Sequence, residues 1–99
     1  MDDTKFFFYV VIMSPEQSRA ARGWLGWSQT ELANRASVSL STVRDFENAH
    51  RVPIANNLDA MRRAIEGAGL RLLFRDDGEP IGVSIANAKA GSRSKPKQS

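Results

Sequence analysis

Short polar side chains and one arginine gather on one side of a helix that the sequence predicts over residues 40–48. At about 100° per residue, one arc of this helix is polar apart from a single leucine, and the opposite arc is mainly apolar. The polar arc consists of Leu40, Ser41, Arg44, Asp45 and Asn48. Arginine can bind guanine O6 and N7 together, a serine hydroxyl can donate or accept, and an alkyl group can contact the thymine methyl. These residue types at this spacing predict a surface that reads base edges in the major groove of DNA.

The neighbouring sequence predicts the elements that would position this surface. Ser39 is the expected cap of the helix, and Val43 and Phe46 are expected to pack on its inner side. Ser28 and Glu31 have the spacing of a capping box, which would open the preceding helix. Three apolar side chains of that preceding helix are expected to face inward, namely Leu32, Ala33 and Ala36. Since only a tight turn fits between the two helices, residues 28–53 predict a helix-turn-helix.

Two further helices are expected on either side of this pair. The first begins at Ser14 and Pro15 and ends at Gly26, with an apolar stripe of Ala20, Ala21, Trp24 and Leu25. Core packing is expected for both tryptophans, Trp24 and Trp27. The last helix is expected to be capped by Asn56 or Asn57 and to end at Gly67 or Gly69, with Leu58, Met61 and Ile65 facing inward.

After Gly69 the apolar residues recur at every second position, which indicates strands. A turn-forming segment at 76–80 separates two such runs, so residues 70–86 predict a β-hairpin. The inward residues are expected to be Leu70, Leu72 and Phe74, then Ile81, Val83 and Ile85. Because an isolated hairpin is marginally stable in water, it must pack on its own helices or join a second copy of the chain. The sequence leaves both alternatives open.

The expected fold is therefore mainly α, with a compact four-helix domain over 14–69 and a hairpin over 70–86. Residues 1–13 contain the apolar run FFFYVVIM, which is either a strand over 6–12 or, if translation starts at Met13, part of an upstream extension. At eight residues the run falls well short of the roughly 20 needed to span a bilayer, so no membrane association is expected. Residues 87–99 are expected to form a disordered basic tail, which holds much of the net positive charge.

The composition points away from enzymes and metal proteins. The chain has no cysteine and a single histidine, so neither a thiolate site nor a histidine cluster can form. No phosphate-binding loop, nucleophile elbow or pair of catalytic acids is present in the sequence. We expect no catalytic residues, no metal and no cofactor. The absence of cysteine and of a secretion signal favours a cytoplasmic protein.

Residues 22–53 resemble the Cro/C1-type helix-turn-helix, the XRE family of bacterial and phage transcription regulators. The residues that fit the family pattern are Gln29, Glu31-Leu32-Ala33, Val38, Ser39, Val43, Phe46-Glu47 and Pro53. The resemblance implies a fold like that of lambda repressor. It also implies base-reading positions at Ser39, Leu40, Ser41, Arg44 and Asp45. The positions implied to contact the DNA backbone are Gln29, Thr42, Asn48 and Arg51.

The chain departs from the family pattern at three places. Ser37 and Ala49 stand where glycine is usual, so either would be strained if its backbone needs a positive φ. The hairpin stands where a fifth helix is usual, so the dimer interface of the family does not carry over. Residues 70–86 are the expected dimer interface, with residues 6–12 as a second candidate.

The predicted function is sequence-specific binding of double-stranded DNA by a homodimeric transcription regulator, a repressor acting on a short palindromic operator. The alternative is an antitoxin or adaptor that binds a partner protein through the hairpin and regulates its own synthesis.

Overall fold

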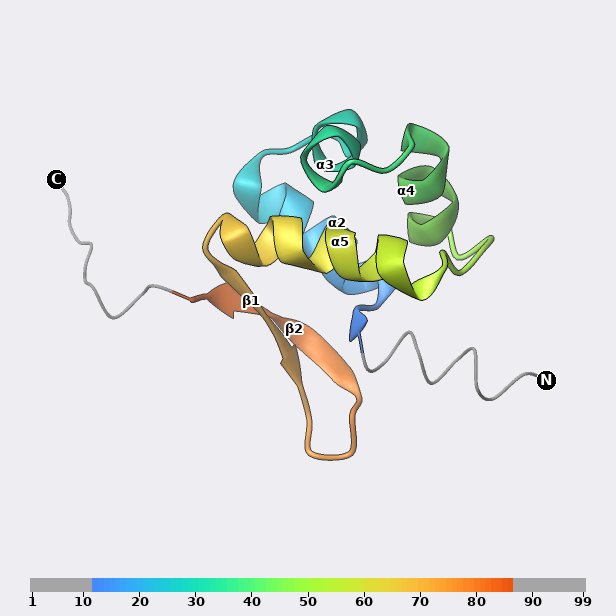
Figure 1. The fold of residues 1–99 in the computed structure, drawn as a ribbon. Coiled ribbons are helices and arrows are strands. Elements are labelled where there is room, and N and C mark those ends of the chain that lie inside the picture. The colour runs from blue at the N-terminus through green and yellow to red at the C-terminus, as the bar shows by residue number, and fades with distance from the viewer. Residues whose placement is uncertain (1–11, 87–99) are drawn as a thin grey trace, which may run out of the picture.

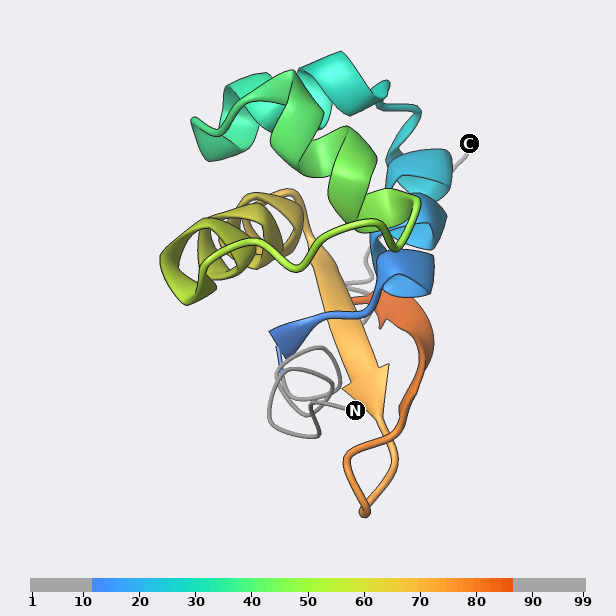
Figure 2. The same ribbon diagram turned by 90° about the vertical axis from the view of Figure 1, so that its right-hand side faces the viewer.

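Four helices and one hairpin make up the computed structural model, which describes residues 12–86. Their order is α2 (Pro15–Leu25), α3 (Gln29–Ala36), α4 (Leu40–Glu47), α5 (Ala55–Gly67), β1 (Leu70–Phe74) and β2 (Pro80–Ile85). Both ribbon views place α2 and α5 between the hairpin on one side and α3 and α4 on the other (Figures 1 and 2). The predicted mainly α fold with a C-terminal hairpin is confirmed. The expected strand over 6–12 lies outside the described residues except for Ile12, which is not in a strand, and the expected basic tail lies outside them entirely.

Three of the helices begin at the predicted serine caps. At α2 the capping box is complete, because the Gln17 backbone N–H donates to Ser14 Oγ (3.1 Å) and the Ser14 N–H donates to Gln17 Oε1 (3.0 Å). At α3 only half of the box forms: Ser28 Oγ accepts from the Glu31 N–H (3.0 Å), while the Glu31 side chain pairs with Arg35. Ser39 caps α4.

The expected asparagine cap of α5 is wrong. This helix begins at Ala55, its N-cap is Ile54, and no side chain bonds to its first turn. The rigid Val52-Pro53 segment brings the chain in extended at Ile54, so the helix starts before either asparagine is reached. The inner face of α5 is as predicted, because Leu58, Met61 and Ile65 are all buried.

One hydrophobic core joins the helices to the first strand. Its buried members are Met13, Ala21, Leu32, Ala33, Ala36, Val43, Phe46, Leu58, Met61, Ile65, Leu70 and Leu72. The expected apolar stripe of α2 is wrong in part, since Ala20 is exposed and Trp24 is 63 % exposed. The inner face of α2 instead carries Gln17, Ser18 and Ala21. Because two of the inward residues are polar, the pattern of apolar residues did not reveal them. The predicted inner face was therefore rotated toward Ala20 and Trp24, away from the observed one.

Trp27 follows the expectation more closely than Trp24 does. It is half-buried and packs against the core, and the Arg35 guanidinium lies 4.5 Å from the centre of its ring. At that distance the cation also interacts with the aromatic face.

The hairpin packs on its own helices, with α2 against β2 and α5 against β1. The antiparallel register pairs Leu72 with Val83 and Leu73 with Gly82. In β1 the expected alternation is confirmed, because Leu70 and Leu72 are buried and Phe74 is partly buried against the core. The alternation of β2 is wrong in part: Val83 is half-buried, but Ile81 is 56 % and Ile85 41 % exposed.

A bulge explains part of this difference. Phe74 pairs with Pro80 rather than Ile81, so Ile81 is an extra residue that the ladder does not accommodate. Ile85 lies at the other end of β2, opposite Leu70, and the bulge does not explain its exposure. Within residues 12–86 no helix is long and apolar enough to cross a membrane.

Both residues that replace the usual glycines adopt a left-handed backbone conformation. Ser37 has φ 58° at the end of α3, and Ala49 has φ 61° just after α4. Side chains with a Cβ are disfavoured in this region, so the expected strain is present at both positions.

Candidate nucleic-acid interface

The N-terminal end of α4 presents three neighbouring hydroxyl groups. Ser39 Oγ accepts from the Thr42 backbone N–H (3.1 Å) and lies 3.1 Å from Ser41 Oγ and 2.8 Å from Thr42 Oγ1. Ser39 and Ser41 are exposed and Thr42 is half-buried. Since each hydroxyl can donate one hydrogen bond and accept others, the cluster keeps bonding capacity toward a ligand outside the helix.

Arg44 and Asp45 follow one turn later on the same side of α4. Arg44 is exposed and Asp45 is half-buried. Among the described residues, neither side chain forms an ion pair or a hydrogen bond, so Arg44 is not held by Asp45 or Glu47. The guanidinium is therefore available for a base edge or a phosphate.

Leu40 is less available than its predicted outward position suggested. It is half-buried and packs against the core beside Val38. Only part of its side chain can reach a ligand. The first residue of a helix lies close to the preceding turn, and here that turn is folded onto the core.

A tight turn after α4 brings Arg51 back toward the helix. The Asn48 N–H donates to Arg44 O (3.0 Å), and the N–H groups of His50 and Arg51 both donate to Asp45 O (2.8 and 3.3 Å). This turn is the segment in which Ala49 adopts its left-handed φ. The strained backbone is what reverses the chain, so it serves to position Arg51.

Four of the predicted site residues meet around one surface hollow of about 350 Å³. The predicted residues that line it are Ser41, Thr42, Asp45 and Arg51. The other lining residues were not predicted as site residues; they are Val52, Pro53, Ile54 and Asn57. Their only sequence signal was their place next to the end of α4. Asn48 is exposed at the end of that helix but does not line the hollow.

Gln29 lies apart from this group and bonds to a buried carboxylate. Its Nε2 donates to Glu47 Oε1 (3.1 Å), and Glu47 is only 2 % exposed. An amide nitrogen carries two hydrogens, so one donor of Gln29 remains for another acceptor. The structure thus places Gln29 as a brace between α3 and α4, whether or not it also contacts a phosphate.

Glu47 fits the family pattern, but its buried and fully bonded position was not predicted from the sequence. It ends α4 on the inner side, where Ser18 Oγ donates to Oε2 (2.5 Å) and Arg22 donates to both oxygens. The Arg19 guanidinium also bonds to the Glu47 backbone oxygen. One signal could have found it: on the helical projection Glu47 falls between Val43 and Leu40, beside the apolar arc.

These contacts decide the charge state of the pair. Burial by itself raises the pKa of Glu47, but the hydrogen bonds from Arg22, Ser18 and Gln29 outweigh it and hold the pKa below its ordinary value of 4.5. The hydrogen bond to Glu47 raises the pKa of Arg22 in turn. Both groups are therefore charged at neutral pH, and the ion pair locks α4 to α2.

The outer face of α4 carries polar side chains with few bonds to the described residues. Its inner side carries the fully bonded carboxylate of Glu47. Comparison with known proteins agrees with this geometry. A family model described as helix-turn-helix matches residues 19–66. No curated protein matches the sequence.

Proposed function

Because residues 19–66 form a helix-turn-helix domain of the Cro/C1 type, the XRE family, we propose that this protein represses transcription as a homodimer on a short palindromic operator. The coarser statement follows from the domain itself: the chain is a DNA-binding transcription regulator of the XRE type. The finer proposal concerns specificity, symmetry and the direction of regulation.

The observation that carries the proposal of specificity is the exposed guanidinium of Arg44, which has no ion-pair partner within residues 12–86. It projects from α4 next to exposed serine hydroxyls, on a helix whose inner side is fixed by Glu47. Such a helix can enter the major groove without rearranging. Arg44 can then donate hydrogen bonds to both O6 and N7 of one guanine. Leu40, Ser39, Ser41 and Asp45 would contribute further base contacts, Leu40 with the exposed part of its side chain.

The proposed backbone contacts surround these base contacts. Arg51 and Thr42 line the hollow beside α4, and Asn48 lies exposed at the end of the same helix. Phosphate contacts from these residues would set the register of α4 in the groove, whereas the base contacts would select the sequence.

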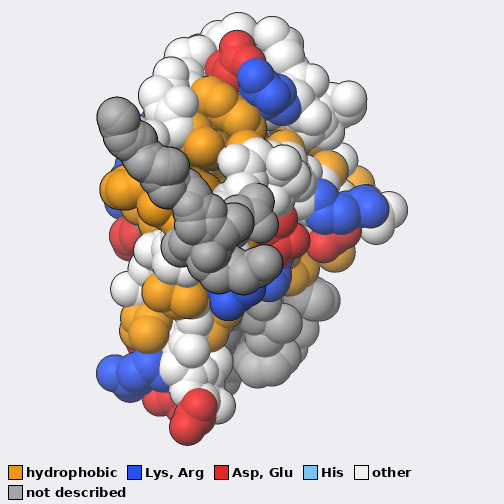
Figure 3. All heavy atoms as spheres, turned by 90° about the vertical axis from the view of Figure 1, so that its left-hand side faces the viewer, with side chains coloured by type: hydrophobic (Ala, Val, Ile, Leu, Met, Phe, Trp, Pro, Cys, Tyr) orange, Lys and Arg blue, Asp and Glu red, His pale blue; other side chains and the backbone are white. Residues whose placement is uncertain are grey.

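Support for a homodimer comes from exposed apolar side chains. Among the described residues, four large hydrophobic side chains are exposed, and Ile81 and Ile85 of β2 are two of them. Hydrophobic side chains reach the surface on the helices and on the hairpin in the view of Figure 3. A two-fold dimer through the hairpin would bury Ile81 and Ile85 and present two α4 helices to half-sites centred about 34 Å apart. A dimer bound to promoter DNA would repress transcription by blocking access to the promoter. We propose that the protein acts in the cytoplasm.

Selection of bound sequences from random duplex DNA, followed by analytical ultracentrifugation of the free protein, tests this proposal. We expect an enriched palindrome and a mass of two chains. Enrichment of no sequence would refute specific binding, and a single unpaired half-site bound by a monomer would refute the dimer.

An antitoxin or adaptor role is the second candidate, favoured by the 63 % exposure of Trp24 on α2. A large exposed aromatic side chain is typical of a protein-protein contact. Gel filtration separates the candidates. A stable complex with the product of a neighbouring reading frame supports this second role, and a homodimer that ignores that product contradicts it.

A further inference from the structure

Within residues 12–86, the buried polar side chains form two hydrogen-bonded pairs that adjoin each other on α2. They are Ser14, Gln17, Ser18 and Glu47. Ser14 bonds to Gln17, and Ser18 bonds to Glu47. Because Gln17 and Ser18 are consecutive residues of α2, the two pairs together reach from the hairpin at one end to the base of α4 at the other. Buried polar groups that are fully bonded favour one arrangement of the parts they join.

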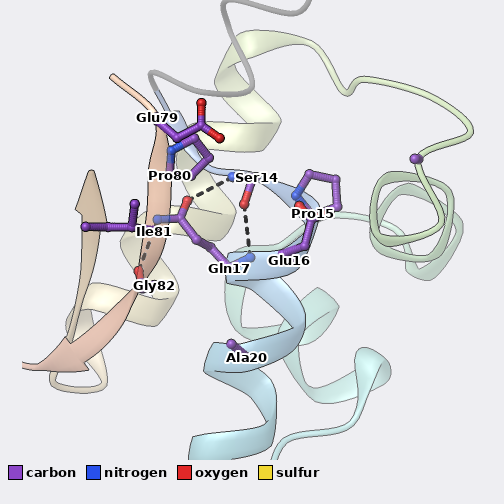
Figure 4. A pocket seen from close by; sticks show the side chains of 10 residues that line it. Ser14, Pro15, Glu16, Gln17, Ala20, Glu79, Pro80, Ile81 and Gly82 are labelled. Carbon is purple, nitrogen blue, oxygen red and sulfur yellow. Dashed lines mark hydrogen bonds between the residues drawn. The ribbon is translucent and has the colours of Figure 1, made fainter. Parts of the chain in front are cut away.

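Gln17 connects α2 to both strands of the hairpin. Its Nε2 donates to Leu73 O (2.8 Å) and to Gly82 O (3.1 Å), while its Oε1 accepts from the Ser14 N–H (3.0 Å). Figure 4 shows the side chain leaving α2 toward Gly82, with its oxygen turned back to Ser14. Both amide hydrogens are thus used, and the residue is only 2 % exposed.

Gln17 bonds to the hairpin just before the bulge, where a change in the strands would alter the direction of the outer hairpin. Leu73 and Gly82 face each other across the ladder, and the bulge at Ile81 begins immediately beyond them. A bulge bends and twists the strand that contains it, so the outer part of the hairpin would swing if this point were free. The two bonds from Gln17 hold it against α2.

The neighbouring residue fixes the other end of the connection. Ser18 Oγ donates to Glu47 Oε2 (2.5 Å), and Arg22, one turn further along α2, holds the same carboxylate. A single turn of α2 therefore bonds to the hairpin on one side and to the last residue of α4 on the other. A large rotation of the hairpin relative to α4 would therefore strain these bonds.

We infer that Gln17 is a positioning residue that holds the hairpin at a fixed angle to the DNA-reading helix and so sets the spacing of half-sites that the dimer accepts. The part on spacing rests on the proposed function, since it requires a homodimer through the hairpin. The part on orientation concerns the single chain and is tested separately.

Spin-label distances measure the orientation directly, because the chain has no cysteine of its own. Asn34→Cys on α3 and Arg71→Cys on β1 introduce two exposed label sites. The labelled protein is mixed with an excess of unlabelled protein, so that only distances within one chain contribute. We expect a narrow distance distribution for the otherwise unchanged protein, and a broader or shifted one when Gln17→Met is added.

Ser14→Ala is the matched control, since it removes the Ser14 Oγ of the capping box but leaves both bonds from Gln17 to the hairpin. Its distribution should remain narrow. Gln17→Asn, which keeps the amide but is one methylene too short to reach both strands, should broaden the distribution as Gln17→Met does. This second variant keeps the test valid if the methionine variant folds poorly. An unchanged distribution in either folded Gln17 variant overturns the inference.

The spacing is tested by DNA binding to palindromes whose half-sites are moved apart or together by one base pair. In the Gln17 variants, preference for the best spacing should fall about threefold or more, while affinity for an isolated half-site should change less than about twofold, because only the geometry of joint binding is altered. A retained preference refutes the part on spacing. If the unchanged protein itself shows no preference, the proposed dimer fails, and the spin-label result still decides the orientation.

Discussion

The guanidinium of Arg22 holds both carboxylate oxygens of Glu47, with Nη2 2.7 Å from Oε1 and Nε 2.9 Å from Oε2. Ser18 adds a donor to Oε2 and Gln29 adds one to Oε1. The side chain of Glu47 is almost fully buried, whereas that of Arg22 retains 19 % exposure. Three helices, α2, α3 and α4, thus meet at one charge, and the orientation of α4 depends on it.

Removing this carboxylate should cost much more than removing an exposed one. We expect Glu47→Ala to lower the free energy of unfolding by about 3 kcal/mol or more, because Arg22 loses its partner while partly buried. Urea denaturation followed by circular dichroism measures the change. Glu31→Ala is the control: its ion pair with Arg35 is solvent-exposed at both ends and should contribute about 0.3–0.5 kcal/mol. Equal losses in the two variants would contradict the importance of burial.

The same carboxylate predicts how stability depends on pH. Since the folded state holds the pKa of Glu47 below 4.5, the ionised form stabilises the fold above that pH, and this contribution is lost as the pH falls through the lower pKa of the folded state. The slope of stability against pH below about 4.5 should therefore be smaller in Glu47→Gln. The Glu79 N–H and Arg75 lower the pKa of Asp77 too, so the difference between the two proteins isolates Glu47. Parallel pH profiles would contradict the assignment.

Relief of backbone strain should stabilise the protein at the turn after α4. Ala49→Gly removes a Cβ from a left-handed position at φ 61°. We expect a gain of about 0.5–1 kcal/mol, since relief of about 1–2 kcal/mol of strain exceeds the added entropy of the unfolded chain. Ser37→Gly should behave alike. Gly26→Ala, at φ 72°, should have the opposite sign. Thermal unfolding of the three variants provides the comparison, and destabilisation by Ala49→Gly would show that the turn is not strained.

Base reading and backbone contact should separate in binding experiments. Arg44→Ala should weaken binding to the selected operator by about 1–3 kcal/mol and relax preference at one base pair, whereas Arg51→Ala should weaken binding to all sequences alike. Arg75→Ala, in the hairpin turn far from α4 in Figure 1, controls for loss of one positive charge. Titrations against operator and random duplexes at one salt concentration give the values. If Arg44→Ala lost equal affinity for both duplexes, it would not read a base.

Self-association should depend on the apolar side chains of β2. Ile81→Asp and Ile85→Asp, singly or together, should shift the dimer toward monomer in sedimentation, because a charge would enter the buried interface. Ile54→Asp is the matched control: Ile54 is 68 % exposed but belongs to the segment before α5. A dimer that survives both β2 substitutions must use another surface.

The sequence predicted the features that depend on nearby residues. Ser14, Ser28 and Ser39 cap their helices through hydrogen bonds to residues three positions away, so the spacing alone identifies them. The left-handed backbone at Ser37 and Ala49 was also predictable, because these residues stand where glycine is usual and φ depends only on the local chain. The hairpin was predictable because its two strands alternate around a turn-forming segment.

Features that depend on distant partners were missed. Glu47 looks like a surface acid unless Arg22, 25 residues earlier, is known to reach it. Gln17 was predicted only as half of a capping box, because its other partners, Leu73 and Gly82, lie 56 and 65 residues away. Trp24 was assigned to the core because apolar size was taken as the guide to the inner face, where Gln17 and Ser18 are buried instead.

The side chains of α4 divide into two groups that hardly touch. The side chains of Ser39 and Ser41 bond only within residues 39–42, and that of Arg44 forms no bond among the described residues. Glu47 carries the long-range bonds. If Ser41 and Arg44 read bases as proposed, substituting them would alter operator choice at little cost to folding, whereas Ser39 also caps α4. The proposed base-reading role would then let the regulator acquire new target genes without losing its fold. In the laboratory, the same division makes α4 a helix whose outer face can be randomised to select new binding specificities.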